Sequence, residues 1–407
     1  MSGAAGQGAA TGPREPLCEP LCEPLCGPLS ERLCVAVVYH VWPHYRQPVM
    51  RAMDASAAIA YDFYGSGEAL DGVIHADTGA VSRFVRAPFR RLGSLLWQPG
   101  AVAAASDRRY QALILLADPH FVSTWVAAVI AKARRRPVLF WGHGWLRHER
   151  GLKRLVRHAC FALCDRFLVY GERGKRIGTR EGFAVERITV VSNSLDVARA
   201  NAVIARIEAG ALRSVRPQSL FTVPGHPLLV CTARLTRACR FDLLIDAAAL
   251  LAARGLPVNV LLVGEGPERA ALERRAADLG VSAQFFGACY DEDVTGQLLY
   301  HSDVTVSPGK IGLTAMHSLM YGTPAITHGD FDAQMPEVEA IEQGVTGAFF
   351  RKDDAASLAD AIARWLAQAP PREIVRAAAR AAIARRWTPE HQARTIEQAV
   401  LEVARRG

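Results

Sequence analysis

The segment SPGKIGLTAMHSLMYGTP, residues 307–324, brings two glycines and a lysine directly before a predicted helix. Gly309, Lys310, Ile311, Gly312 and Leu313 offer successive backbone N–H groups that have no carbonyl of a preceding helical turn to bond. Together with the helix dipole, such amides favour a bound anion such as phosphate. A plain strand-to-helix turn, in which glycine only relieves strain, is the alternative interpretation of this loop.

The helix after this loop adds two polar side chains, Thr314 in its first turn and His317 one turn later. One ring nitrogen of His317 could hold a substrate hydroxyl. The residue could equally be a core histidine that bonds a backbone carbonyl.

Two further loops of the second half suit the same anionic ligand. Arg234, Arg237 and Arg240 follow an apolar run that ends at residue 233, and guanidinium groups can clasp a diphosphate with paired hydrogen bonds. At least one of these arginines could simply be solvated. Gly264 and Gly266 directly follow another apolar run, a position where glycine permits a close approach of a ligand.

Histidines mark the ends of the predicted strands in the first half. His143 stands between two glycines at the end of one run and could act as a general base or hold a substrate hydroxyl. His120 follows another run, and His40 and His44 follow the first. We expect these loops to meet at one sheet edge and to line the acceptor side, although any one of the histidines could be incidental.

The elements that must position these residues are short β-branched or apolar runs that alternate with alanine-rich helical stretches. Such runs, buried on both faces, are typical of parallel strands in βαβ units. One series covers residues 34–40, 112–117, 136–141, 166–170 and 188–192; a second covers residues 227–233, 258–264, 283–287, 303–307 and 324–327. We therefore predict an α/β protein of two facing Rossmann-like domains, in which ligands bind beyond the carboxyl ends of the strands.

The predicted domains are an N-terminal one over residues 34–214 and a C-terminal one over residues 215–388. A final amphipathic helix over 389–407 is expected to pack back toward the first domain. Residues 1–33 are predicted to be a disordered, low-complexity leader, which contains a repeated Pro-Leu-Cys unit. Cys18, Cys22 and Cys26 could bind a metal, but proline-rich disorder is the simpler interpretation.

Composition narrows the class of partner only partly. The chain of 407 residues carries a formal charge of +8, which suits anionic small molecules, anionic lipid surfaces or nucleic acid. No module that combines aromatic and basic residues is evident, so nucleic acid is not an expected partner. Nine cysteines scattered mostly singly, no apolar run long enough to span a bilayer and no secretion signal predict a cytoplasmic protein.

Several segments together resemble the retaining glycosyltransferases of family 4, also called group 1, which have the GT-B fold of two facing Rossmann-like domains. They are VCTARLTRACRFDLLIDA, LLVGEGPERAAL, FFGACYDED, HSDVTVSPGKIGLTAMHSLMYGTPAIT and EAIEQGVTGAFF, in family order, and VVSNSLD before the interdomain joint. The 307–317 segment matches a subfamily whose donor loop reads SPGxxGLTAxH.

This resemblance implies transfer of a sugar from a nucleoside-diphosphate sugar to an acceptor hydroxyl, in surface polysaccharide or glycolipid assembly. The loop at 308–313 would hold the diphosphate and His317 would face the ribose. Arg234 and Arg240 or Arg237 would neutralise the leaving group. His143 would approach the transferred sugar and the acceptor. No metal cofactor is expected, and the loops at 264–266 and 288–290, which ends at Tyr290, would flank the nucleotide.

Two departures from the family pattern motivate an alternative. Gly309 stands where the family has its first motif glutamate, and Cys239 stands where it has a lysine; a thiol cannot carry that charge. A catalytically impaired protein that binds a nucleotide sugar or a partner on the same scaffold is therefore the second hypothesis.

Two stretches of the first half, residues 83–97 and 146–158, mix basic with large apolar residues. They could lie on an anionic bilayer, which would suit a lipid-linked acceptor and a peripheral position at the inner face of the plasma membrane. An ordinary helix with one solvated face and one buried stripe is the alternative.

Overall fold

The computed structural model describes residues 32–67 and 74–405. The Pro-Leu-Cys repeat, with the possible metal ligands Cys18, Cys22 and Cys26, lies outside the described residues.

The first Rossmann-like domain is built on a parallel sheet of seven strands in the order β3-β2-β1-β6-β7-β8-β9. Its strands are β1 (Leu33–Val38), β2 (Ile59–Gly65), β3 (Phe84–Arg86), β6 (Ala112–Leu116), β7 (Val138–Gly142), β8 (Arg166–Val169) and β9 (Ile188–Val190). The helices are α1 (Gln47–Asp54), α2 (Pro99–Ser106), α3 (Val122–Ala133), α4 (Gly151–Ala162) and α5 (Glu172–Arg180); the next helix, α6 (Val197–Glu208), packs on the second domain.

The second domain repeats the arrangement with a six-stranded sheet in the order β12-β11-β10-β13-β14-β15. Its strands are β10 (Leu228–Thr232), β11 (Asn259–Val263), β12 (Ala283–Gly287), β13 (Val304–Ser307), β14 (Ala325–His328) and β15 (Gly347–Phe350). Its helices are α7 (Phe241–Ala253), α8 (Arg269–Asp278), α9 (Glu292–Tyr300), α10 (Leu313–Met320), α11 (Ala355–Gln368) and α12 (Arg372–Arg386). All strand pairs of both sheets are parallel, which confirms the predicted α/β class.

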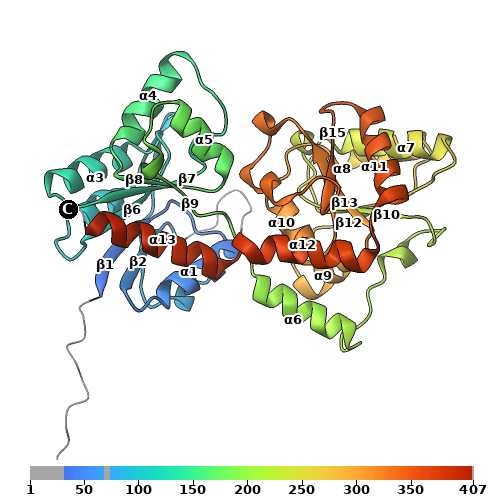
Figure 1. The fold of residues 1–407 in the computed structure, drawn as a ribbon, viewed down its shortest axis with the longest axis horizontal. Helices are drawn as coiled ribbons and strands as arrows, with labels where there is room; N and C mark the ends of the chain where they lie inside the picture. The colour runs from blue at the N-terminus through green and yellow to red at the C-terminus, as the bar shows by residue number, and fades with distance from the viewer. Residues whose placement is uncertain (1–31, 68–73, 406–407) are drawn as a thin grey trace, which may run out of the picture. The chain divides into compact units, whose positions relative to one another are not determined.

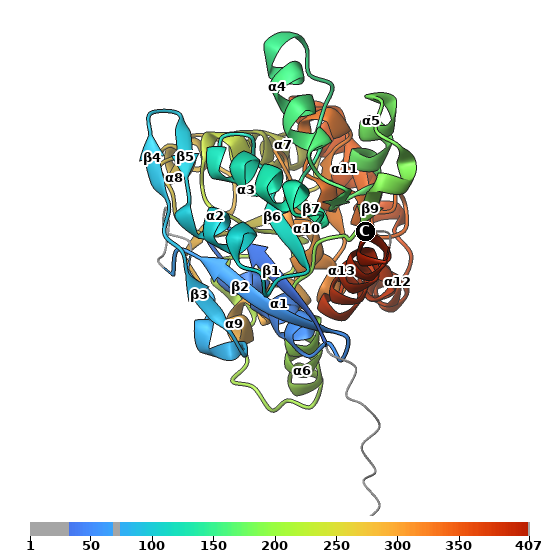
Figure 2. The same ribbon diagram turned by 90° about the vertical axis from the view of Figure 1, so that its left-hand side faces the viewer.

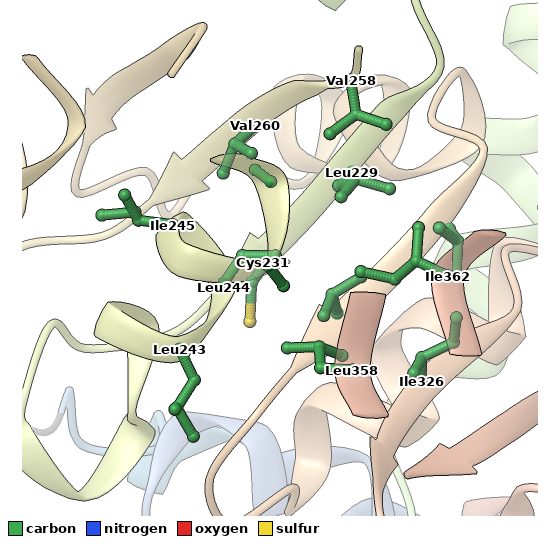
Figure 3. Close-up of a cluster of buried hydrophobic side chains, with 14 of the residues drawn as sticks. Leu229, Cys231, Leu243, Leu244, Ile245, Val258, Val260, Ile326, Leu358 and Ile362 are labelled. Carbon is green, nitrogen blue, oxygen red and sulfur yellow. The ribbon is translucent and has the colours of Figure 1, made fainter. Parts of the chain in front are cut away.

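Apolar residues pack one face of the second sheet against α7 and α11. Leu229 and Cys231 of β10 and Val260 of β11 meet Leu244 of α7 and Leu358 of α11 (Figure 3). Each of these side chains is at most 1% exposed, so the sheet is a rigid base for the loops at its carboxyl edge.

The sequence pattern missed three strands and a hairpin. β2, β3 and β15 lie at or next to sheet edges, where burial is uneven and the apolar runs are short or interrupted. Residues 83–97 do not form a helix with a buried stripe: after β3, the strands β4 (Arg90–Leu92) and β5 (Leu95–Trp97) pair as an antiparallel hairpin around Gly93, whose φ is 64°. The hairpin and α4 both stand off the first sheet (Figure 2).

The last helix, α13 (Pro389–Ala404), leaves the second domain and packs on the first (Figure 1). Ile396 and Val400 are fully buried in the core that β1, β2 and α1 also form. Gln392 of the same helix donates to the carbonyl of Ser192 and accepts from the hydroxyl of Ser194, which lie in the segment after β9.

Within the described residues, no helix is long and apolar enough to cross a membrane. The six cysteines of this part of the chain, residues 34, 160, 164, 231, 239 and 289, are all free thiols.

Candidate functional site

Each sheet has one point at which the strand order reverses, and most of the predicted site residues lie in loops beside these two points. In the first sheet the reversal falls between β1 and β6, whose loops carry His44 and His120. In the second it falls between β10 and β13, whose loops carry Arg234 and Gly312. Connections leave these two strands toward opposite sides, which opens a crevice at the carboxyl edge where ligands bind.

The loop between β13 and α10 offers fewer open amides than its sequence suggests. The N–H of Gly309 donates to the carbonyl of Cys239 at 3.0 Å, and that of Ile311 donates to Oε1 of Gln334 at 2.8 Å. Among the described residues, the N–H groups of Lys310, Gly312 and Leu313 have no acceptor. These three amides at the start of α10 are therefore the ones available to an anion.

Gln334 organises this loop, and sequence reasoning missed it. Its side chain is buried; besides accepting from Ile311, its Nε2 donates to Oγ1 of Thr327 at 2.9 Å and to the carbonyl of His328 at 3.1 Å. The amide thereby joins the loop to the end of β14. It comes from a segment 23 residues beyond Ile311, so no local pattern announces it.

Three glycines of the predicted donor site are in close contact with the backbone of a neighbouring loop. A Cβ at Gly264 would stand 2.0 Å from the carbonyl oxygen of Ala233, one at Gly266 2.2 Å from that of Leu235, and one at Gly309 2.1 Å from that of Ala238. All three contacts are made to the loop after β10. These glycines allow that loop, which carries Arg234, to lie directly on its neighbours.

Gly312 differs from those three glycines. A Cβ there would meet only the side chain of Met335, at the ordinary contact distance of 3.7 Å. The space beside Gly312 is therefore not filled by packed backbone and is open to a ligand.

The arginines after β10 fall into two groups. Arg240 forms ion pairs with Asp242 and Asp353, so its charge is already compensated. Arg234 and Arg237 are exposed, and neither has an ion-pair partner among the described residues. The thiol of Cys239 bonds within its own loop, to the carbonyl of Arg234 at 3.2 Å.

A cleft of about 610 Å³ opens beside the start of α10. This volume lies within the usual range of small-molecule sites. Four predicted donor residues and one predicted acceptor residue line it: Tyr290, Leu313, Thr314, His317 and His44. The hydroxyl of Thr314 also donates to the carbonyl of Thr232 at 3.1 Å, which ties α10 to the end of β10.

Glu292, which sequence reasoning did not single out, lies in the wall of the same cleft. Its Oε1 accepts from the hydroxyl of Tyr321 at 2.7 Å and is 3.0 Å from Nε2 of His317. Burial alone would raise the pKa of Glu292, but the hydrogen bonds from His317 and Tyr321 outweigh it and lower the pKa to about 2. The acidic run in FFGACYDED was the available signal.

The first-domain histidines do not all meet at one place. His143 lines a small cavity of about 20 Å³ together with Gln334 and Met335 of the second domain. His120 is exposed and bonds Asp118 at 2.8 Å, whereas His44 lines the large cleft. Desolvation by the surrounding protein and then the nearby Arg46 guanidinium lower the pKa of His143 to about 4, although the residue is exposed in the folded chain.

Arg46 is a buried cation that the sequence did not reveal. Its guanidinium lies 4.9 Å from the ring centres of Tyr39 and Trp141 and 5.3 Å from that of Tyr170, and it donates to the Tyr170 hydroxyl. Within the described chain no carboxylate pairs with it. Aromatic faces therefore hold the charge, which adds to the effect of desolvation in lowering the pKa of His143.

Polar contacts join the two Rossmann-like domains at one side of the site. Asn193 donates to Glu337 at 2.8 Å. Glu339 accepts from the first two backbone N–H groups of α5, those of Glu172 at 2.8 Å and Arg173 at 2.7 Å. A carboxylate at a helix N-terminus is favourable, so this contact stabilises the observed arrangement of the domains.

Throughout the described residues, no group of three His, Cys, Asp or Glu side chains is arranged to hold a metal ion.

The chain is similar to several known proteins in sequence or in fold. Residues 216–382, which make up most of the second domain, match the family model described as "Glycosyl transferases group 1".

Two curated relatives match part of the chain. A GDP-mannose-dependent alpha-(1-6)-phosphatidylinositol dimannoside mannosyltransferase of Mycobacterium tuberculosis is 38% identical over 117 residues, which are 28% of this chain and 30% of that protein. A 2-deoxystreptamine glucosyltransferase of Streptomyces kanamyceticus is 29% identical over 152 residues, 36% of this chain and 38% of that protein. The matched parts thus span about a third of each relative.

The solved structure of Anabaena Alr3699/HepE in complex with UDP has the same fold. It aligns with a TM-score of 0.67 at 16% identity and covers 91% of this chain and all of that one. The fold is therefore the GT-B fold, as predicted.

Proposed function

We propose that the protein is a retaining glycosyltransferase that moves a sugar from a nucleoside-diphosphate sugar to an acceptor hydroxyl. The observation that carries the proposal is the set of open amides of Lys310, Gly312 and Leu313 at the start of α10, next to the cleft of about 610 Å³. Support comes from the group 1 family match and from the names of the relatives, both of which are glycosyltransferases.

The proposed chemistry assigns a role to each part of the site. The bond between the anomeric carbon and the diphosphate oxygen breaks, and its electron pair leaves with the diphosphate. The amides of the loop, Lys310 and the unpaired Arg234 and Arg237 stabilise the charge that develops there. The acceptor oxygen bonds the anomeric carbon on the same face, and its proton passes to the departing diphosphate oxygen, while neutral His143 contacts the sugar and acceptor hydroxyls.

Arg237 replaces Arg240 in this proposal. Asp242 and Asp353 already compensate the Arg240 charge, whereas Arg237 is exposed and without a carboxylate partner in the described part of the chain. No resident metal is assigned a role, because the cations and amides of the loops supply the charge compensation. We also place the chain in the SPGxxGLTAxH subfamily of family 4, on the donor-loop sequence.

A thermal-shift screen with GDP-mannose, UDP-glucose, ADP-glucose and dTDP-glucose tests the donor site. A donor at 100 times its dissociation constant should add about 2.7 kcal/mol to the free energy of unfolding. Arg234→Ala should abolish the gain, whereas Arg254→Ala, an exposed arginine paired with Asp360, should keep it. No shift with any of the four would contradict the proposal.

The second candidate is a protein that binds the donor without turnover, and the Cys239 thiol in place of a lysine motivates it. Its Sγ bonds within its own loop and carries no compensating charge. Release of nucleoside diphosphate that falls on His143→Ala would favour the transferase. Tight binding without release, against a broad acceptor panel, would favour the second candidate.

NMR of the product would show whether the anomeric configuration is retained. Activity after EDTA treatment would test whether the reaction is independent of metal.

For the acceptor we propose a sugar or lipid-linked acceptor for surface polysaccharide or glycolipid assembly, reached at the cytoplasmic face of an anionic membrane. Leu152 and Leu155 of α4 are 74% and 63% exposed, and Lys153 between them has no acidic partner in the described residues. An apolar stripe bordered by basic groups suits an anionic bilayer. The helix follows β7 and so lies on the acceptor side of the proposed site.

A further inference from the structure

Glu292, His317 and Tyr321 form a hydrogen-bonded group in which one carboxylate oxygen is occupied and the other is open. Oε1 of Glu292 is shared by the His317 ring and the Tyr321 hydroxyl. Oε2 has no hydrogen-bond partner among the described residues, and it retains some exposure to solvent. Since Glu292 lines the cleft, Oε2 can be reached by a ligand there.

The arrangement is more than a structural ion pair. If the Glu292–His317 ion pair served only to join α9 to α10, the carboxylate would not need to line the cleft with one oxygen left unbonded. The neighbouring Asp293 shows the contrast, because both of its oxygens bond Arg206 of α6, at 3.0 and 2.8 Å. Glu292 is held by two donors on one side and remains an acceptor on the other.

The distance from the amide cradle indicates what Oε2 would accept. His317 lies four residues beyond Leu313 on α10, which is about 6 Å along the helix axis. A ligand with its diphosphate at the start of α10 would therefore bring its ribose to the level of His317 and Glu292. A ribose offers two adjacent hydroxyl donors, which match a carboxylate acceptor.

We propose that Glu292 is a specificity-determining residue that accepts hydrogen bonds from the 2′- and 3′-hydroxyls of the donor's ribose, with His317 and Tyr321 as positioning residues. The inference rests on the proposed function, since it takes the cleft as the site of a nucleoside diphosphate. It also gives His317 a different role from the one expected from sequence: the ring orients the carboxylate that binds the hydroxyls.

Isothermal titration calorimetry with UDP, GDP, ADP and their 2′-deoxy and 3′-deoxy forms tests the proposal. For the nucleotide that binds, we expect the wild-type chain to prefer the ribose form over each deoxy form by about tenfold or more. Glu292→Gln should reduce that preference to about threefold or less. Tyr321→Phe should reduce it partly, because Oε1 then loses one of its two donors.

Asp293→Asn is the matched control, a neighbouring carboxylate on the same helix that does not line the cleft. It should keep the wild-type preference. The ratio of ribose to deoxyribose affinity within one variant separates recognition from a general loss of folding.

Equal affinity of the wild-type chain for ribose and deoxyribose forms would overturn the assignment of Glu292 and leave the donor site intact. An undiminished preference in Glu292→Gln would do the same. If none of UDP, GDP and ADP bound the wild-type chain and none of the four sugar nucleotides shifted its unfolding, the proposed function would fall together with this inference.

Discussion

Gly309 and Gly312 stand three residues apart in one loop, yet the structure gives them opposite surroundings. The α-carbon of Gly309 is packed against the backbone at Ala238, whereas Gly312 faces the open space beside Met335. The first therefore serves the fold and the second is free to serve a ligand.

A pair of substitutions separates these roles. Gly309→Ala should lower the free energy of unfolding by about 2 kcal/mol or more, because its Cβ would stand 2.1 Å from the Ala238 carbonyl oxygen. Gly312→Ala should lower it by no more than about 1 kcal/mol and should remove the stabilisation given by the best nucleotide sugar. Urea unfolding with and without the donor measures both effects. The assignment of the cradle is wrong if Gly312→Ala binds the donor as tightly as wild type.

His143 gives a prediction on pH. An ordinary histidine is about 90% protonated at pH 5.5, but the lowered pKa of about 4 keeps His143 neutral there. As the pH falls from about 6.5 toward 4, the unfolded chain takes up a proton that the folded chain refuses, so stability is lost across that window. NMR titration of the imidazole, assigned with His143→Gln, should give the low value, and the variant should lose less stability on acidification. A titration midpoint near 6.5 would contradict this account.

Sequence could predict which loops lie beside the candidate cleft, because glycines, arginines and histidines cluster after apolar runs that end at the carboxyl edges of the sheets. It could not predict which atoms of those loops remain available. Gln334 accepts a hydrogen bond from the Ile311 amide, and Asp353 forms an ion pair with Arg240. Glu292 lies within hydrogen-bond distance of His317. Each of these partners comes from a distant part of the chain, so only the folded arrangement reveals them.

At the scale of elements, strands buried on both faces were predicted well and half-exposed ones poorly. β10 and β11 are continuous apolar runs, whereas the hairpin β4–β5 has an exposed strand, Arg90–Leu92, and a mixed composition that also fits an amphipathic helix. A three-residue strand carries too few positions for its alternation to be distinguished from helical spacing.

The exposed stripe of α4 leads to an element-scale prediction. Replacing Leu152 and Leu155 by serine should weaken binding to vesicles containing phosphatidylglycerol by about tenfold or more, since each leucine would bury apolar area in the bilayer. The melting temperature should change little, because both side chains are already exposed in the folded chain. Vesicle flotation and thermal unfolding provide the two measurements.

The matched control replaces two exposed leucines of the second domain, Leu256 and Leu279, by serine. This pair should leave vesicle binding unchanged. Equal loss in both double variants, or no loss in the α4 variant, would remove α4 as the membrane contact.

At the scale of the whole molecule, the chain returns from the second domain to the first through its last helix, α13. α12 packs against α10 of the second domain, and α13 then packs against α1 of the first (Figure 1). Gln392 bonds the Ser192–Ser194 segment at the same place. The chain therefore passes between the two domains twice, and stability of the first domain depends on residues that follow the second in sequence.

Because α13 packs on the first domain, a substitution in α13 should destabilise that domain. Ile396→Ala should lower the free energy of unfolding by about 3 kcal/mol, because the side chain is fully buried in the core of β1, β2 and α1. Gln398→Ala, at an exposed position of the same helix, should change it by less than about 0.5 kcal/mol. Hydrogen exchange should locate the loss of protection in α1 and β2, while β10 and β11 keep theirs, because the two sheets have separate cores. If exchange instead accelerated first in β10 and β11, α13 would be supporting the second domain, and the account of the chain's return would be wrong.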